Sequence, residues 1–189
     1  MSTKRWYVWN GVKNRFVPAK RPPQDPKIAK AMQRLKIRLA TTNDRQKLFN
    51  FRREAIETEP EIWLPDELDL NKIRKNINEW EPSEYPNNFI IVAELNGKII
   101  GFLHLTICYR LFNGGPSAWV EDLFVLKNFR GYKVGTKLME FAKEIAREKG
   151  CKTLKLIVGL ENLAGLRFYR QCGFKTIKVG LATMKLKTQ

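Results

Sequence analysis

Two side chains of this 189-residue chain could move protons in one reaction: the carboxyl group of Glu121 and the phenol of Tyr169. An amine with a pKa of about 10.4 is mostly protonated at neutral pH, so a base must remove a proton before the nitrogen can attack a carbonyl group. Glu121 is the candidate for that base. Tyr169 could return a proton to a departing thiolate as general acid. Together the two residues suit the transfer of an acyl group from a thioester to an amine.

Both residues have a structural alternative. Alternation along a strand puts Glu121 on the same face as Leu123 and Val125, which would partly desolvate the carboxylate and raise its pKa. Without such burial Glu121 is a solvated acid at the end of a strand, and Asp122 is the second choice for the base. Tyr169 follows helical spacing, and an aromatic side chain on a helix usually packs against its neighbours.

A turn suited to a phosphate follows the strand that carries Glu121. Residues 128–136 include two glycines and lead into helical spacing. The first N–H groups of a helix have no intrahelical partner, and the helix dipole favours an anion at that end. The spacing fits neither the dinucleotide fingerprint nor the P-loop, and an ordinary strand-to-helix turn is the alternative. Four basic side chains add positive charge to the turn, those of Lys127, Arg130, Lys133 and Lys137.

A sheet and several helices must position these residues. Apolar alternation predicts the strands, 3.6-residue periodicity predicts the helices, and Asn96-Gly97 is the clearest hairpin turn. The order β-α-α-β-β-β-α-β-α-β-β predicts a mixed sheet with helices packed against it. The strands are expected at about residues 37–41, 89–95, 98–108, 118–126, 153–158, 174–179 and 181–186, and the helices at about residues 42–57, 66–80, 135–149 and 163–172.

Residues 1–35 differ in character from the rest of the chain. The first 38 residues carry a net charge of +10, and the others carry only +6 of the total of +16. A hairpin is expected near Asn10-Gly11, and a short basic helix at residues 28–35. Basic and aromatic side chains are interleaved here in a way that suits stacking on single-stranded nucleic acid. The alternative is an arm for solubility or subunit docking, which leaves a homodimer open.

Composition argues against several classes of protein. No apolar run approaches the roughly 20 residues of a membrane span, and the N-terminus lacks the apolar stretch of a secretory signal. The three cysteines have neither CxxC spacing nor histidine partners, so we expect no disulfide framework and no metal site. A reducing cytoplasm is the expected location. The single histidine, His104, lies in an apolar strand, and we expect it to be structural.

Two motifs carry a resemblance to a known family. The first is VEDLFVLKNFRGYKVGTKLM at residues 120–139, and the second is NLAGLRFY at residues 162–169, followed by CGF at residues 172–174. With these motifs the chain resembles the GNAT superfamily of N-acetyltransferases over residues 36–187. The spacing from Glu121 to Asn162 to Tyr169 is similar to that of the spermidine/spermine and diamine branch.

The resemblance implies an α/β (α+β) fold with a mixed, mostly antiparallel sheet of six to seven strands flanked by about four helices. The basic N-terminal extension would cover residues 1–35, and the enzyme domain residues 36–189. The implied reaction passes an acetyl group from acetyl-CoA directly to a polyamine, a diamine, a small primary amine, or a protein lysine or N-terminus. The alternative is a nucleic-acid- or ribosome-associated protein with a GNAT-like domain. The implied cofactor-binding residues are Leu123, Phe124, Val125, Arg130, Gly131, Tyr132, Lys133, Val134, Gly135, Thr136, Asn162 and Phe168.

The resemblance also implies where the cofactor lies. The strands at residues 120–125 and 154–158 would part at one end, so that pantetheine inserts like an added strand beside Leu123 and Val125. The N–H group of Val125 would then stabilise the thioester oxyanion. Asn162 would cap its helix and also bind the pantetheine arm.

One position departs from the family pattern, because Lys133 stands where the first loop glycine is usual. If the backbone needs a positive φ at this position, lysine costs about 1 kcal/mol more than glycine. The lysine ammonium group would also lie beside the diphosphate, which could compensate for that cost.

The acceptor side has one candidate, an acidic segment. Residues 54–69 hold seven acids and no base, which would attract a cationic amine. Tyr85, Tyr109 and Trp119 could help to line such a site. The alternative is a solvated, acidic helix end.

Overall fold

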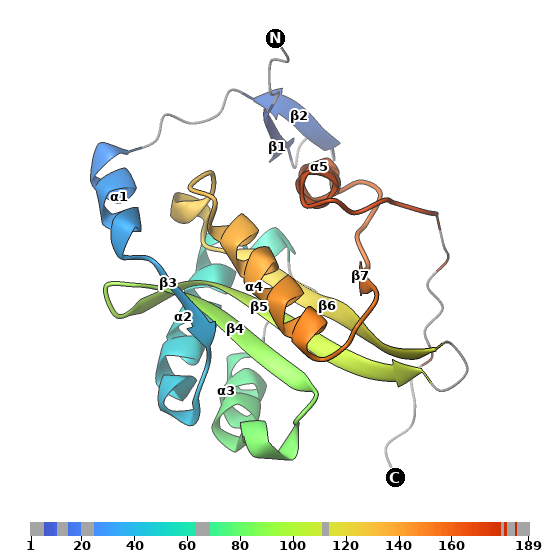
Figure 1. Cartoon of the computed structure of the whole chain (residues 1–189). Helices are drawn as coiled ribbons and strands as arrows, with labels where there is room; N and C mark the ends of the chain where they lie inside the picture. Colours follow the sequence, from blue (N-terminus) through green and yellow to red (C-terminus); the bar gives the residue numbers. More distant parts are fainter. Residues whose placement is uncertain are drawn as a thin grey trace. The chain divides into compact units, whose positions relative to one another are not determined.

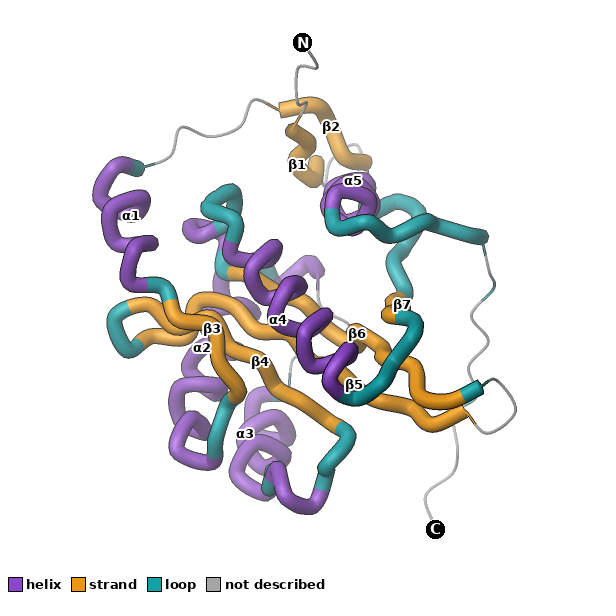
Figure 2. The backbone as a smooth tube through the Cα atoms, in the orientation of Figure 1, coloured by secondary structure: helices purple, strands orange, loops and turns teal. Residues whose placement is uncertain are grey.

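The structure is a computed structural model that describes residues 6–10, 15–19, 25–62, 69–110, 114–178, 180 and 184. The chain divides into two units: residues 21–157, and residues 1–20 together with residues 158–189. Within the described residues, the larger unit holds the main sheet and four α-helices, and the smaller unit holds a two-stranded hairpin and one α-helix (Figures 1 and 2).

The main sheet has five strands in the order β3-β4-β5-β6-β7. The first four pair antiparallel, and β7 lies parallel to β6. This confirms the mixed, mostly antiparallel sheet. The strands are β3 Lys36–Leu39, β4 Asn88–Leu95, β5 Lys98–Arg110, β6 Gly115–Val125 and β7 Leu154–Leu156.

Within the described residues the main sheet has five strands, so the expected sheet of six to seven strands is not found there. Residues 174–178 form no strand, and the Ile177 side chain is 77% exposed. Apolar residue types favour a strand through the burial of their side chains against neighbours, and that burial is missing at Ile177. The other expected strand, at residues 181–186, lies outside the described residues except for residue 184.

Helices cover both faces of the sheet in the larger unit (Figure 1). On one face lies α4, where Leu138, Met139 and Ala142 are buried. On the other face lie α2 and α3, and here the rings of Phe51 and Phe102 pack edge to face with centroids 5.6 Å apart. The α-helices are α1 Pro26–Ala31, α2 Arg45–Thr58, α3 Leu70–Glu79 and α4 Val134–Glu148, and 3-10 helices cover Met32–Arg34, Thr42–Asp44, Pro60–Ile62, Pro82–Glu84 and Lys127–Phe129.

Local sequence signals set several of these boundaries. Asn96 and Gly97 have φ angles of 50° and 81° and close the β4–β5 hairpin, which confirms the Asn-Gly turn. Gly150 follows α4 with a φ of 73°, as a helix-terminating glycine often does. Asp69 caps α3 by accepting hydrogen bonds from N–H groups of its first turn. No helix in the described part of the chain combines the length and the apolar character that a bilayer crossing needs.

An ion-pair network joins β3 to the start of α2 and to β4. Arg38 Nη1 and Nη2 donate to the two carboxylate oxygens of Asp44 at 2.7 and 2.8 Å, and Nη2 also donates to Glu94 at 2.6 Å. Lys47 Nζ reaches Glu94 at 3.1 Å. Asp44 is only 3% exposed, and the hydrogen bonds from Arg38 lower the pKa of its carboxyl group to about 2. The network therefore stabilises the buried, ionised carboxylate of Asp44 at neutral pH.

In the smaller unit, β1 Trp6–Asn10 and β2 Arg15–Ala19 form the expected hairpin, and α5 covers Leu163–Gln171. The register pairs Asn10 with Arg15. Asn10 therefore ends the first strand, and the connection is not the two-residue Asn10-Gly11 turn that the sequence suggests. Residues 11–14 lie outside the described residues.

Candidate active site

The turn between β6 and α4 has the backbone geometry of an anion site. Gly131 and Lys133 have φ angles of 86° and 64°, in the left-handed region. Lys133 directly precedes α4, and the Lys137 N–H donates to the Lys133 carbonyl at 3.0 Å. The N–H groups of residues 134–136 therefore have no partner within the helix and can point at an anion. The positive φ at Lys133 is the condition under which this lysine is strained by about 1 kcal/mol.

The basic side chains of the turn fall into two groups. Lys127, Lys133 and Lys137 are exposed. Arg130 is engaged within the protein, because its two Nη atoms donate to the carboxylate of Glu59 at 2.8 and 2.5 Å and its Nε donates to the Val125 carbonyl at 2.8 Å. The lysines can therefore approach a phosphate, and direct cofactor binding by Arg130, which is also exposed, stays a prediction.

Tyr132 also has a partner within the larger unit. The backbone N–H of Asp25, the N-cap residue of α1, donates to the Tyr132 hydroxyl at 2.7 Å. This hydrogen bond joins the start of α1 to the turn across 107 residues of sequence. It gives Tyr132 a structural contact that no pattern in the sequence predicts.

One edge of β6 is only partly covered by β7. The β6–β7 pairing covers residues 118–120 and ends there, and no other described strand of the larger unit pairs with that edge at residues 121–125. Because β7 ends at Leu156, where this pairing ends, the expected parting of the two strands stays a prediction, and the edge of β6 is open to an added strand. On the opposite edge, the Leu126 N–H donates to the Ile100 carbonyl of β5 at 3.0 Å. Because successive N–H groups of a strand alternate in direction, the Val125 N–H points to the uncovered edge.

Glu121 lies at a β-bulge. In the β5–β6 pairing, His104 faces Asp122 and Leu105 faces Val120, so Glu121 is an extra residue without a cross-strand partner. The side chains of Glu121 and Asp122 are both exposed. The expected partial burial of Glu121 is therefore wrong, because the bulge interrupts the alternation from which it was inferred. Its role as general base stays a prediction.

His104 adds a third titratable group beside this bulge. Its Nε2 lies 3.1 Å from Asn88 Oδ1, which also accepts a hydrogen bond from Thr106 Oγ1 at 3.0 Å. Burial lowers the pKa of His104, and the charges of Asp122 and Glu121 oppose that shift. The histidine is thus a half-buried member of a polar cluster close to the candidate base.

The second motif contributes residues of the smaller unit. Asn162 Oδ1 accepts a hydrogen bond from the Gly165 N–H at 2.8 Å, which confirms Asn162 as the N-cap of α5. The Tyr169 ring packs edge to face against Phe168 and Phe174, with centroids 5.3 and 5.9 Å apart. The packing role expected of a helix aromatic is therefore present, and the role of Tyr169 as general acid stays a prediction.

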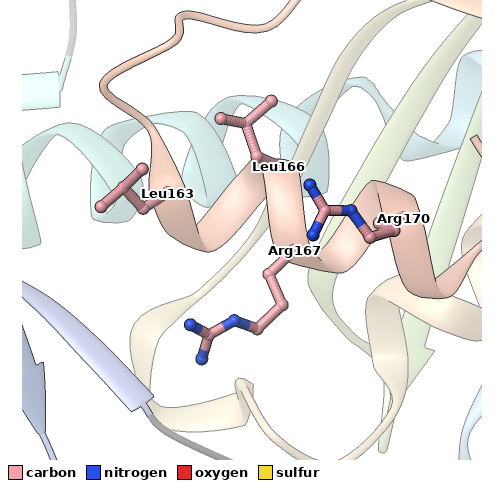
Figure 3. Close-up of a pocket in the computed structure, with 4 residues that line it drawn as sticks. All are labelled: Leu163, Leu166, Arg167 and Arg170. Carbon is pink, nitrogen blue, oxygen red and sulfur yellow. The ribbon is translucent and has the colours of Figure 1, made fainter. Parts of the chain in front are cut away.

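Figure 3 shows a hollow along α5 that combines two leucine and two arginine side chains. All of its lining residues come from this one helix, and Leu166 and Arg167 point away from each other. The sequence did not single out this hollow, because the motif on the same helix draws attention to Asn162 and Tyr169. The lining residues are Leu163, Leu166, Arg167 and Arg170.

The acidic segment at residues 54–69 is less available to a cationic substrate than its composition suggests. Glu54 pairs with Lys98 at 2.6 Å, Glu59 is bound by a guanidinium group, and Asp69 caps α3. These three acids stabilise the fold, so their charge is not freely available to a substrate. Residues 63–68, which include two further acids, lie outside the described residues.

Residues 48–174 match the acetyltransferase (GNAT) family. This chain is a member of that family. The matched segment begins within α2 and ends just after α5, so it includes the β6 bulge, the turn before α4 and the residues of the second motif. Membership agrees with the resemblance carried by the two motifs.

Individual relatives agree in sequence and in fold. An uncharacterized N-acetyltransferase of Archaeoglobus fulgidus is 38% identical over 96 residues, which are 50% of this chain and 65% of the relative. An integron cassette protein from the mobile metagenome of V. cholerae shares the fold with a TM-score of 0.68 and 21% identity, over 82% of this chain and 93% of that one. An aminoglycoside N-acetyltransferase solved in complex with CoA has a TM-score of 0.60 and 21% identity, over 80% of this chain and 94% of that one. The chain spans 39% to 65% of the length of the first three curated relatives that it matches.

Proposed function

We propose that this protein is an acetyl-CoA-dependent N-acetyltransferase, with residues 36–189 as its enzyme domain. The observation that carries the proposal is the turn at Gly131 and Lys133, which precedes α4 and follows the end of β6, where one edge at residues 121–125 pairs with no described strand of the larger unit. A diphosphate at the turn and a pantetheine chain along that edge would be continuous, as one CoA molecule requires. Family membership supports the same cofactor.

In this proposal the backbone holds most of acetyl-CoA. The N–H groups of residues 134–136 bind the diphosphate, with Lys127, Lys133 and Lys137 as nearby cations. Pantetheine pairs with the uncovered edge at Leu123 and Val125. The Val125 N–H, which points to that edge, stabilises the negative charge that forms on the thioester oxygen during attack.

Two of the proton transfers in the reaction are assigned to side chains. Glu121 takes a proton from the acceptor ammonium, and the freed nitrogen attacks the carbonyl carbon of the thioester. The nitrogen loses its second proton to water as the C–S bond breaks, and the CoA thiolate takes a proton from the phenol of Tyr169. Glu121 returns its proton to water and Tyr169 regains one from water, so the products are the acetylated amine and CoA with a free thiol. The exposed position of Glu121 leaves it open to acceptor and to water.

The proposed acceptor is a primary amine: a polyamine, a diamine, a small amine, or a protein lysine or N-terminus. Glu121 and Asp122 are adjacent, exposed acids at the bulge and would attract its positive charge. The proposed location is the cytoplasm. No comparison supports a nucleic-acid-binding role for residues 1–35 or a homodimer, and neither enters the proposal.

Release of free thiol from acetyl-CoA in the presence of an acceptor panel tests this function. The panel would contain spermidine, diamines, lysine analogues and basic peptides. With the best acceptor, Glu121→Gln should lower kcat by about 10²–10⁴-fold and leave the Kd for CoA unchanged. Glu144→Gln, at an exposed acid of α4, is the matched control and should behave as the unmodified protein. Absence of thiol release with every acceptor, together with no heat of CoA binding in calorimetry, would refute the proposal.

A further inference from the structure

Glu59 is a buried carboxylate at a place where a helix disfavours an acid. It is the C-cap residue of α2 and is only 7% exposed. The C-terminal end of a helix carries partial negative charge, so a carboxylate there is repelled, and burial removes the water that would solvate it. Helix stability therefore does not account for a glutamate at this position, and a specific partner must offset both costs.

Arg130 is that partner, and from the turn it contacts both the end of α2 and the end of β6. Its Nη1 and Nη2 donate to the two oxygens of Glu59 at 2.8 and 2.5 Å, in the bidentate arrangement that gives the strongest carboxylate pairs. Its Nε donates to the Val125 carbonyl at 2.8 Å, and the guanidinium carbon lies 5.1 Å from the centroid of the Phe124 ring. One side chain thus joins the end of α2, the end of β6 and the start of the turn.

These contacts reach both parts of the proposed CoA site. Arg130 directly precedes Gly131, so a fixed Arg130 side chain restrains the backbone whose N–H groups would bind the diphosphate. The same guanidinium holds the carbonyl of Val125, the residue whose N–H would stabilise the thioester oxygen. An error of about 1 Å at such a position can lower the rate about a hundredfold. The Glu59 carboxylate accepts hydrogen bonds from the Arg130 guanidinium, so we expect its influence on Val125 and on the rest of the turn to pass through Arg130.

We propose that Glu59 is a positioning residue for acetyl-CoA: its carboxylate holds the Arg130 side chain, which fixes the diphosphate turn and the end of β6 relative to each other. This inference rests on the proposed function. Glu59 also neutralises the guanidinium, so Arg130 acts on the cofactor through the backbone, and the exposed lysines act on it through their charge.

A double-mutant cycle tests the proposal with the full-length protein. Glu59→Gln keeps the shape of the side chain and removes its charge, and we expect a Kd for CoA and a KM for acetyl-CoA about tenfold higher, with the KM for the acceptor unchanged. In an Arg130→Gln background the same substitution should change neither value, because Glu59 acts only through Arg130. Glu57→Gln, at an exposed acid of the same helix, is the matched control and should bind CoA as the unmodified protein does.

The outcomes separate this inference from the proposed function. If the unmodified protein binds CoA and Glu59→Gln binds it within twofold, the positioning role is refuted and the function stands. Glu59→Asp, which shortens the carboxylate by one methylene, provides a second test if the glutamine variant does not fold, and wild-type affinity in it would also refute the role. Hydrogen exchange does not depend on CoA: amides of residues 131–137 should exchange faster in Glu59→Gln, and unchanged exchange there would overturn the inference even if no CoA binding were found.

Discussion

Replacement of Lys133 by glycine separates the conformational role of this position from its electrostatic role. Lys133 has a φ of 64° and a ψ of 15° immediately before α4. A left-handed conformation costs a non-glycine residue about 1–2 kcal/mol. Glycine avoids that cost but makes the unfolded chain more flexible, which removes about 0.4–1 kcal/mol of the gain. We therefore expect Lys133→Gly to raise the free energy of unfolding by about 0.5–1 kcal/mol.

Thermal unfolding and CoA titration together check this expectation. For a chain of this length, 1 kcal/mol corresponds to about 2–4 °C in Tm, so Lys133→Gly should raise Tm by about 1–4 °C. Lys133→Ala is the matched control, because it removes the ammonium group but keeps the strained φ, and its Tm should not rise. Both variants should bind CoA more weakly than the unmodified protein and lose the same part of the salt dependence of binding.

Two results would refute this reasoning. A Tm that rises equally in the alanine and glycine variants would show that the left-handed backbone is not the source of the gain. CoA binding that keeps its affinity and its salt dependence in both variants would show that the Lys133 ammonium group lies too far from the diphosphate to act on it.

Three further predictions follow from the structure. The pKa of Asp44 is about 2 in the folded protein, below its ordinary value of 3.8, so its contribution to stability is complete above about pH 4 and is lost as the pH falls through 2. Urea unfolding at a series of pH values should show the free energy of unfolding fall by about 2 kcal/mol over that range, and the fall should be smaller in Asp44→Asn. Gly101→Ala would place a Cβ 3.3 Å from Leu138 Cδ1 and 3.2 Å from the Phe124 carbonyl oxygen. We expect urea unfolding to show a free energy of unfolding about 1–3 kcal/mol lower in this variant. Gly180→Ala, whose Cβ would meet nothing within 4 Å, should change the free energy of unfolding little. Tyr169→Phe should slow turnover without abolishing it, because water can protonate a thiolate of pKa about 8.5, and an unchanged kcat would leave the tyrosine with packing alone.

Elements with local signals could be predicted from the sequence. Asn96 and Gly97 close their hairpin with two positive φ angles, and Asn162 caps α5 through an N–H three residues away. α4 buries the apolar stripe that its 3.6-residue period defines. In each case the residues that decide the structure are close together in the chain, so propensity and pattern are sufficient.

Features that depend on strand pairing could be predicted only in part. The family pattern implies an open edge at the end of β6, and the β6–β7 pairing does end at residue 120, but the pattern does not imply the bulge at Glu121, which changes which residues share a face. Ile177 illustrates the same limit, because its apolar type favours a strand while its 77% exposure shows that no neighbour buries it. Register and burial are properties of the partner as much as of the segment itself.

The charges of the turn depend on contacts that are still more distant. The sequence assigns Lys127, Arg130, Lys133 and Lys137 alike to a phosphate, but Glu59, which is 71 residues from Arg130, pairs with that side chain. The planar guanidinium matches a carboxylate with two parallel hydrogen bonds, whereas an ammonium group is a point charge on a flexible chain. Among the four basic residues, the arginine is therefore the one that suits pairing with the buried glutamate. The three lysines are left at exposed positions, where their attraction for a diphosphate is long in range and weakened by salt.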